Sequence, residues 1–336
     1  MANPLILVAP GLLAQPPEAL ARVRTLQSLA GVADMPVAAE DATGAVLDAL
    51  GMPPDTPIAP LLAREGDVGM HDYVIVAEPV LLVADRDDLV LVDRVDDLVA
   101  DESAELIALL NRHFSEDGLH FFDAGSVTWL ARVDRPPALR TTPVDIARRR
   151  GILPYLPTGP DARTWTRWQN EIQMLLHDHP VNVAREARGR VPVTGVWFWG
   201  GGRADATGAV PRISAKTVPN RIGNLVRAIA RIGAGTHADA APGETLEDIV
   251  AASHGNSAIV VVGNRIDVES AIADFDAEAL APALSLLDRG AVDPLHVIAD
   301  GNGGAARWTA APPTLWRRFF ARGRRKAFVV PDPPGS

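Results

Sequence analysis

The chain has 336 residues, a formal net charge of −10, 47% hydrophobic residues and no cysteine. This length suits one large domain or two modest ones, and the lack of cysteine excludes disulfides, thiolate nucleophiles and cysteine-ligated metals. The negative charge disfavours binding to nucleic acid or to anionic membranes. No apolar run is long enough to predict a membrane span. Because the start of the chain also lacks the charge pattern of an export signal, we expect a cytoplasmic protein.

The first part of the chain has the pattern of an α/β fold. Apolar runs predict buried strands at 5–9 and 73–77, and helical spacing predicts a helix at 18–30. Strands separated by helices are typical of a largely parallel sheet. We therefore assign residues 1–78 to the first part of an α/β core.

Residues 79–160 change character and predict an inserted α+β subdomain. Strands are expected at 89–92 and 128–133, around a helix at 102–114. Acidic residues crowd this segment: Asp85, Asp87, Asp88, Asp93, Asp96, Asp97, Asp101 and Glu102. A carboxylate metal site is one interpretation. A solvated hairpin and helix cap is the favoured one, because aspartate is common at turns and helix starts.

The α/β pattern returns over residues 161–315, which we assign to the second part of the core. Helices are predicted at 161–179, where Pro180 ends the pattern, at 220–232 and within 269–288. Strands are predicted at 193–199 and 258–262, followed by a hairpin of 295–299 with 307–310.

Residues 316–336 form a basic C-terminal tail. Its cations are Arg317, Arg318, Arg322, Arg324, Arg325 and Lys326. A docked terminal helix with a solvated basic face is the favoured interpretation. The alternative is a docking patch for an acidic protein partner or an anion.

Four blocks between residues 140 and 202 carry a family resemblance. They are Thr-Thr-Pro-Val-Asp-Ile at 141–146, Leu-Pro-Thr-Gly at 156–159, His-Pro-Val-Asn at 179–182 and Val-Trp-Phe-Trp-Gly at 196–200. In order and spacing they resemble the archaeal-type cofactor-independent phosphoglycerate mutases of the alkaline phosphatase superfamily. The whole chain is also similar to bacterial proteins labelled phosphoglycerate mutase or RpfE-type regulatory protein. This resemblance implies an alkaline-phosphatase-like α/β core, with a mostly parallel sheet and helices on both faces, plus an inserted α+β subdomain.

The same resemblance implies a catalytic site that this chain does not reproduce. Such mutases use two divalent metals and a serine that is transiently phosphorylated. Their first metal ligand lies in an Asp-Gly pair after the first strand, where this chain has Pro10-Gly11. The serine position falls on Ala42, between Asp41 and Thr43. Near the C-terminus these mutases have a further metal-binding segment that contains histidine. The corresponding segment of this chain contains the carboxylates Asp267 and Asp274 and no histidine.

We therefore expect no metal and no cofactor, and a degenerate mutase-like protein with a regulatory or ligand-sensing role. The alternative is an active mutase or phosphatase with a rearranged site and a divalent metal such as manganese or zinc. In that case Thr43 and Asp41 are the weak catalytic candidates.

A phosphorylated small molecule is the ligand class that the resemblance favours. Candidate contacts are Arg140, Asn182, Arg185 and the run Gly200, Gly201 and Gly202. Glycines after a strand let backbone N–H groups approach an anion, and arginine pairs with phosphate in a bidentate way. An equally weighted alternative is a tight turn with surface arginines.

Overall fold

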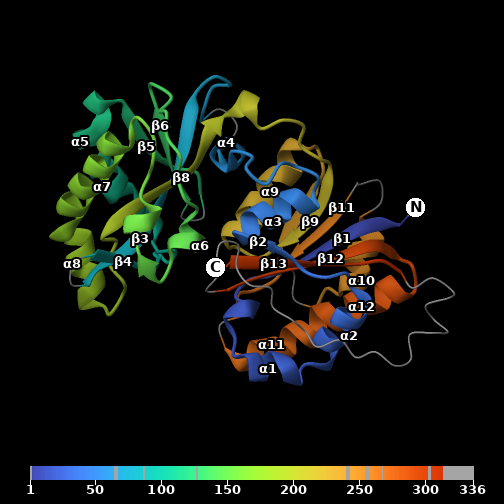
Figure 1. Ribbon diagram of the computed structural model, residues 1–336. Coiled ribbons are helices and arrows are strands. Elements are labelled where there is room, and N and C mark those ends of the chain that lie inside the picture. The colour runs from blue at the N-terminus through green and yellow to red at the C-terminus, as the bar shows by residue number, and fades with distance from the viewer. Residues whose placement is uncertain are drawn as a thin grey trace. The chain divides into compact units, whose positions relative to one another are not determined.

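The computed structural model describes residues 2–63, 67–85, 88–125, 128–239, 243–253, 258–266, 268–301 and 304–312. The chain folds into two compact units (Figure 1). The core unit comprises Met1–Pro54 and Ala209–Ser336, and the inserted unit comprises Asp55–Gly208. These boundaries differ from the predicted ones at 78/79 and 160/161, so the insertion is longer than the sequence pattern indicated.

The core unit contains a seven-stranded sheet in the order β10-β9-β11-β1-β12-β13-β2. Its strands are β10 (Thr236–Asp239), β9 (Ile213–Thr217), β11 (Ala258–Val262), β1 (Asn3–Ala9), β12 (Val292–Gly301), β13 (Gly304–Ala310) and β2 (Val37–Ala39). The first five run parallel, while β13 lies antiparallel to both β12 and β2. The predicted strands at 5–9 and 258–262 and the predicted hairpin are confirmed.

Helices cover both faces of this sheet (Figure 1). They are α1 (Pro17–Arg22), α2 (Arg24–Val32), α3 (Ala42–Ala49), α9 (Arg221–Ile232), α10 (Leu246–Ala252), α11 (Glu269–Phe275) and α12 (Ala281–Asp288). Helices α3 and α9 lie on one face, and the others lie on the opposite face. The predicted helix at 18–30 is divided, because Val23 adopts an extended conformation between α1 and α2.

The alternation of side chains along β1 explains how one strand contributes apolar side chains to both faces of the sheet. Leu5 and Leu7 join the apolar cluster of α1, α2, α11 and α12, whereas the equally buried Ile6 and Val8 are not part of that cluster. Successive side chains of a strand point to opposite faces, so a sheet covered on both faces needs a continuous apolar run. The expected fold class, an α/β core with a mostly parallel sheet and helices on both faces plus an α+β insertion, is confirmed.

The inserted unit is built on an antiparallel sheet in the order β5-β6-β3-β4-β7, with β8 paired along β3. Its strands are β5 (Leu119–Asp123), β6 (Trp129–Val133), β3 (Tyr73–Asp85), β4 (Asp88–Arg94), β7 (Arg150–Gly151) and β8 (Gly195–Arg203). Its helices are α4 (Ile58–Leu62), α5 (Ala100–Phe114), α6 (Val144–Ala147), α7 (Ala162–His177) and α8 (Pro180–Ala187). The predicted strand at 73–77 therefore belongs to this sheet and not to the parallel core.

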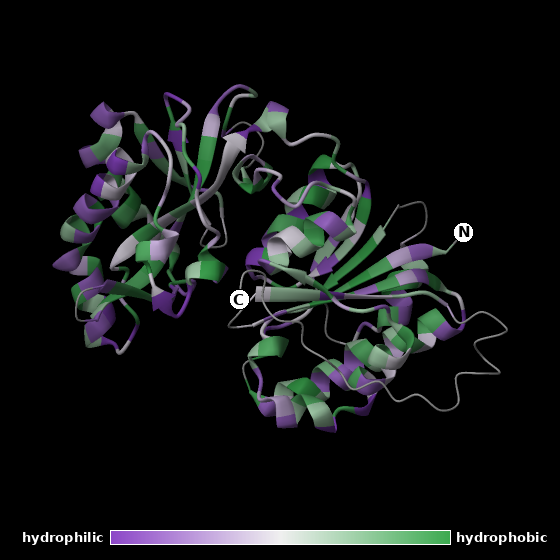
Figure 2. Ribbon diagram, in the orientation of Figure 1, coloured by the Kyte–Doolittle hydropathy of each residue, from purple (hydrophilic) through white to green (hydrophobic). Residues whose placement is uncertain are grey.

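An aromatic cluster holds α5 and α7 against the inserted sheet. Trp165 and Trp168 of α7 contact each other at 5.3 Å between ring centroids, and Phe198 of β8 lies 4.9 Å from Trp165. These rings are buried with the apolar stripe of α5. Figure 2 shows the matching pattern, with hydrophilic residues along the outer sides of α5 and α7.

None of the helices in the described ranges has the length and hydropathy needed to cross a bilayer.

Candidate functional site

The carboxyl ends of the parallel strands in the core unit share one edge of the sheet. The turn Pro10-Gly11 follows β1, Gly263 follows β11, and Asp300 lies near the end of β12. Asn220 follows β9 and caps α9. Ligands of open α/β sheets bind outside this edge, so these turns are the first place to look for a functional site.

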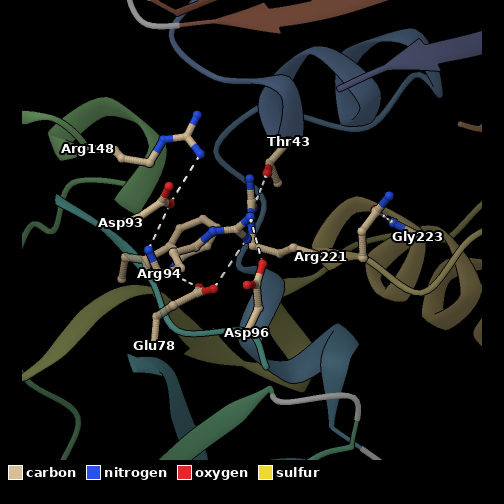
Figure 3. Close-up of polar contacts among 10 residues, drawn as sticks. Thr43, Glu78, Asp93, Arg94, Asp96, Arg148, Arg221 and Gly223 are labelled. Carbon is tan, nitrogen blue, oxygen red and sulfur yellow. Dashed lines mark hydrogen bonds and ion pairs between the residues drawn. The ribbon is translucent and has the colours of Figure 1, made fainter. Parts of the chain in front are cut away.

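Thr43 and Arg221 meet at the starts of two helices on the same face of the sheet. Nη1 of Arg221 donates a hydrogen bond of 2.6 Å to Oγ1 of Thr43 (Figure 3). Thr43 is buried at 3% exposure, and Arg221 is half-buried. A guanidinium keeps its charge at all accessible pH values and can bind phosphate through two N–H groups. The pair therefore places a permanent cation beside a buried hydroxyl.

Two capping interactions fix this pair. Oδ1 of Asp41 accepts from the backbone N–H of Gly44 at 2.8 Å and caps α3. The side chain of Asn220 accepts from Gly223 at 2.8 Å, caps α9 and donates to the carbonyl of Gly263 at 3.2 Å. Caps of this kind satisfy backbone donors that a helix start leaves open. Of the two predicted catalytic candidates, Asp41 thus caps α3, and Thr43 contacts an arginine that the sequence analysis did not single out.

The Pro10-Gly11 turn binds Asp300 directly. The N–H of Gly11 donates to Oδ1 of Asp300 at 2.5 Å, and the carbonyl of Pro10 accepts from Ile266 at 2.7 Å. Gly11 has φ +80°, and a Cβ there would lie 2.6 Å from the carbonyl oxygen of Ile266. This turn is consequently packed against the chain after β11, and it carries no side chain that could ligate a metal.

The donor side chains in the described part of the chain do not fit a two-metal centre. Among the described residues, no three His, Asp or Glu side chains are grouped closely enough to hold one ion. Asp274 is exposed on α11, whereas Asp41 starts α3 on the opposite face of the sheet (Figure 1). Asp267 lies outside the described residues.

Asn182 and Arg185, two of the predicted ligand contacts, have structural roles in the inserted unit. The amide of Asn182 donates to the carbonyls of Leu176 and Val193 at 2.7 Å each and accepts from the N–H of Val193 at 2.9 Å. It therefore ties α8 to the end of α7 and to the chain before β8. The side chain of Asn182 is 2% exposed, and this network uses both ends of its amide.

Arg185 is fully buried, at 0% exposure. Its Nε donates to the carbonyl of Val191 at 2.8 Å, and Nη1 donates to Glu102 at 2.5 Å. Nη2 donates to Asp97. All three nitrogens of the guanidinium thus donate to the protein, which gives Arg185 a structural role. A ligand contact of Arg185 stays a prediction.

The run Gly200–Gly202 is also occupied by the protein itself. It lies in β8 where the pairing with β3 shifts register. A Cβ at Gly200 would lie 2.6 Å from Ile58, and one at Gly202 would lie 2.5 Å from Pro57. At Gly201 the hydroxyl of Tyr73 would lie 2.6 Å away. These glycines allow close packing of Pro57, Ile58 and Tyr73 on β8. Binding of an anion by their backbone stays a prediction.

Arg140 is the predicted contact that remains exposed. Its backbone forms a bridge with Thr158, through hydrogen bonds of 2.8 and 3.0 Å. A ligand contact of the exposed Arg140 side chain therefore stays a prediction. His177 and Asp178 are exposed at the end of α7, and His179 caps α8 through Nδ1.

The acidic segment of the inserted unit binds arginines. Arg94 lies 3.5 Å from Glu78 and 3.7 Å from Asp96, and Arg148 lies 3.4 Å from Asp93 (Figure 3). Burial opposes the charge of Arg94, but Glu78 and three neighbouring aspartates outweigh it, so the pKa of Arg94 is raised. Part of the segment predicted as a solvated hairpin thus forms ion pairs in which the arginine is largely buried and the aspartate is partly exposed. The basic tail, 316–336, lies outside the described residues.

Part of the chain is similar in sequence to proteins of one family. No family model matches the chain. The 2,3-bisphosphoglycerate-independent phosphoglycerate mutase of Methanosarcina mazei is 28% identical over 120 residues, which are 35% of this chain and 30% of that protein. A probable 2,3-bisphosphoglycerate-independent phosphoglycerate mutase of Geobacter sulfurreducens is 37% identical over 62 residues, which are 18% and 15% of the two chains. The matches thus span less than a third of each relative.

Two solved structures align with most of the chain. The PH0037 protein of Pyrococcus horikoshii aligns with 94% of this chain and 89% of its own, at a TM-score of 0.50 and 13% identity. The cofactor-independent phosphoglycerate mutase of Thermoplasma acidophilum aligns with 93% and 90%, at a TM-score of 0.43 and 18% identity. The former supports a shared fold. The chain is therefore similar, over a limited part of its sequence, to 2,3-bisphosphoglycerate-independent phosphoglycerate mutases.

Proposed function

We propose that this chain is a ligand-sensing regulatory protein that uses a mutase-like fold to bind a small phosphate ester without metal-dependent turnover. The hydrogen bond between Arg221 and Thr43 is the observation that carries this proposal. It supplies a fixed cation at the ligand-binding edge of an α/β sheet. The ligand class is inferred from the limited sequence similarity to phosphoglycerate mutases.

The chemistry of Arg221 fits a phosphate ester. Arg221 is the first residue of the 12-residue helix α9, whose N-terminus carries a partial positive charge. A phosphoryl group that accepts from its guanidinium would gain both this field and charge-assisted hydrogen bonds. The Thr43 hydroxyl, now the acceptor of Arg221, would then be free to donate to the same phosphoryl oxygens.

Two features of this edge of the sheet argue against a mutase mechanism. The turn after β1 carries Pro10, and the carboxylate of Asp300 accepts from Gly11. A metal-dependent phosphoryl transfer needs carboxylates and imidazoles that converge on the transferred group. The residues around Thr43 are a guanidinium and a helix-capping carboxylate, which do not form such a donor set.

Isothermal titration with 3-phosphoglycerate tests the proposal. We expect Arg221→Gln to weaken binding about 10- to 100-fold, because a hydrogen bond to a charged group contributes about 1.5–3 kcal/mol. Arg24→Gln is the matched control, since Arg24 is exposed on α2 of the same unit. Absence of binding at millimolar ligand, or equal affinity in the two variants, would contradict the proposed site.

A coupled mutase assay distinguishes this proposal from the active-enzyme alternative. The wild-type protein is assayed with manganese and with zinc, and compared with Thr43→Ala. Metal-stimulated turnover that Thr43→Ala abolishes would show an active mutase or phosphatase. Binding without turnover is the expected result.

A further inference from the structure

A cavity in the inserted unit has two chemically different walls. Its volume is about 380 Å³, and α7 lines one side of it. The α7 side chains are Thr166, Gln169, Asn170 and Gln173, at positions i, i+3, i+4 and i+7, which share one face of a helix. The facing wall is apolar and includes Leu82 of β3, Ile152 and Trp197 of β8.

Gln169 is the polar group in this cavity that the protein leaves unsatisfied. Its side chain is 6% exposed, and Oε1 has no hydrogen-bond partner among the described residues. A buried amide oxygen without a partner is less stable than one that is hydrogen-bonded, because it has lost its hydrogen bonds to water. An unsatisfied buried group in a native structure calls for an explanation, and a bound molecule that satisfies it is one. Rotation about the last side-chain bond turns either end of the amide toward the cavity.

The charges around the cavity define the kind of molecule that fits. Among the described residues that line it, Asp88 is the one with an ionisable side chain, and its Oδ1 accepts from the N–H of Leu89 at 2.7 Å. A carboxylate at the wall repels anions, and apolar side chains do not repay their desolvation. This site therefore differs in ligand class from the phosphate-ester site proposed for the core unit.

We propose that this cavity binds an uncharged small molecule that has an apolar body and a planar amide-like edge. Such an edge pairs with the amide of Gln169 through one donor and one acceptor, while the apolar body packs on Trp197 and Leu82. Amide side chains recognise planar donor–acceptor edges in this way. The volume suits a molecule of one or two rings, at the lower end of the range for small-molecule pockets.

Benzamide is the probe, and benzoate is its charged counterpart of the same size. Nuclear magnetic resonance spectra of the 15N-labelled full chain report binding through the indole N–H of Trp197, which lines the cavity and is present in every Gln169 variant. This signal is assigned by its loss in Trp197→Phe. We expect benzamide to bind with a dissociation constant on the order of millimolar, as its few heavy atoms allow. We expect benzoate to bind at least fivefold more weakly.

Gln169→Leu should weaken the binding of benzamide at least fivefold. It should leave the midpoint of urea unfolding unchanged or raise it, because it removes an unsatisfied buried amide. Gln169→Met, which keeps the length of the side chain, should do the same. Met174→Leu is the control, since Met174 is exposed on the same helix and does not line the cavity. Lack of benzamide binding, equal binding of benzoate, or undiminished affinity in both Gln169 variants would each overturn the proposal.

Discussion

Arg221 and Thr43 are 178 residues apart in sequence, yet the guanidinium of one donates to the hydroxyl of the other at 2.6 Å. This contact joins the first turn of α9 to the first turn of α3. Because both helices follow turns at the carboxyl edge of the same sheet, the hydrogen bond also holds the edge of the proposed ligand site in place.

We expect Thr43→Val to lower the free energy of unfolding by about 1–2 kcal/mol, since it removes the acceptor of a largely buried hydrogen bond. Thr43→Ser, which keeps the hydroxyl, should lose much less. Urea unfolding measures both. In the background of Arg221→Met the cost of Thr43→Val should fall by about 0.5–1.5 kcal/mol, the coupling expected for residues in contact. An unchanged cost would show that the two residues are not coupled.

A second prediction concerns Asn182. Replacement by Leu leaves two buried carbonyls and one buried N–H without their partner, so we expect a loss of about 3 kcal/mol. The amide of Val193 should also lose hydrogen-exchange protection, because its acceptor is Oδ1 of Asn182. Asn170→Leu is the control, because Asn170 is exposed on α7. Retained protection of Val193 would contradict the role assigned to Asn182.

The elements of the core unit were largely predictable from local pattern. The run Leu5–Ala9 is apolar and ends at Pro10-Gly11, and such a run between breakers indicates a buried strand. The helix after Asn220 was likewise marked by a capping residue and by Gly233 at its end. In both cases the information lies within about ten residues, and tertiary contacts agree with it.

The division into units was not predictable in the same way. The apolar run at 73–77 reads as a buried strand whether its partners are parallel or antiparallel. Its partners in β6 and β8 come 54 or more residues later in the chain, so the sequence around β3 does not reveal the pairing. For the same reason α7 and β8 were assigned to the core although they belong to the inserted unit.

The candidate site was also only partly predictable from the sequence. Glycine runs and arginines have the same composition whether they bind an anion or pack against the protein, and the neighbours decide which. At Gly200 and Gly202 the neighbours are Ile58 and Pro57. At Arg185 they are Asp97 and Glu102. The acidic segment at 85–102 was a usable signal for this last contact, because buried arginine needs carboxylate partners.

The glycine interpretation yields a third prediction. Gly202→Ala should destabilise the chain by about 1–3 kcal/mol, because the new methyl group lies 2.5 Å from Pro57 and forces a shift in the packing of β8. Gly31→Ala is the matched control. Gly31 lies in α2 with no atom within 4 Å of the added methyl group, so this change should stabilise by about 0.4–1 kcal/mol. Equal effects of both changes would contradict close packing at Gly202.

A fourth prediction concerns the buried guanidinium of Arg185. Arg185→Met leaves Glu102 largely buried without its cation, and we expect a loss of about 3–5 kcal/mol. Arg167→Met removes an exposed pair with Glu171 and should cost less than about 1 kcal/mol. Urea unfolding compares the two. A difference below 1 kcal/mol between them would show that the buried pair contributes no more than a surface pair.

The last prediction concerns pH. His296 lies in β12, with Nδ1 3.0 Å from the hydroxyl of Thr309, and Arg307 is on the neighbouring strand. Burial, and then the charge of Arg307, lower the pKa of His296 to about 4, against a partial opposing effect of Asp48. In the unfolded chain a histidine has a pKa of about 6.5. Between these values the unfolded chain therefore binds more protons than the folded one.

It follows that the free energy of unfolding decreases as the pH falls from about 6.5 to about 4. A half-buried ring is partly screened by solvent, so we expect His296 to account for about 1–2 kcal/mol of this decrease. Burial and the charge of Arg227 also lower the pKa of His237, which adds a decrease of the same sign. His296→Gln should flatten the profile in part, because glutamine does not titrate. Urea unfolding between pH 4 and pH 7 measures the slope, and a His296→Gln profile that coincides with the wild-type profile would show that His296 is protonated equally in both states.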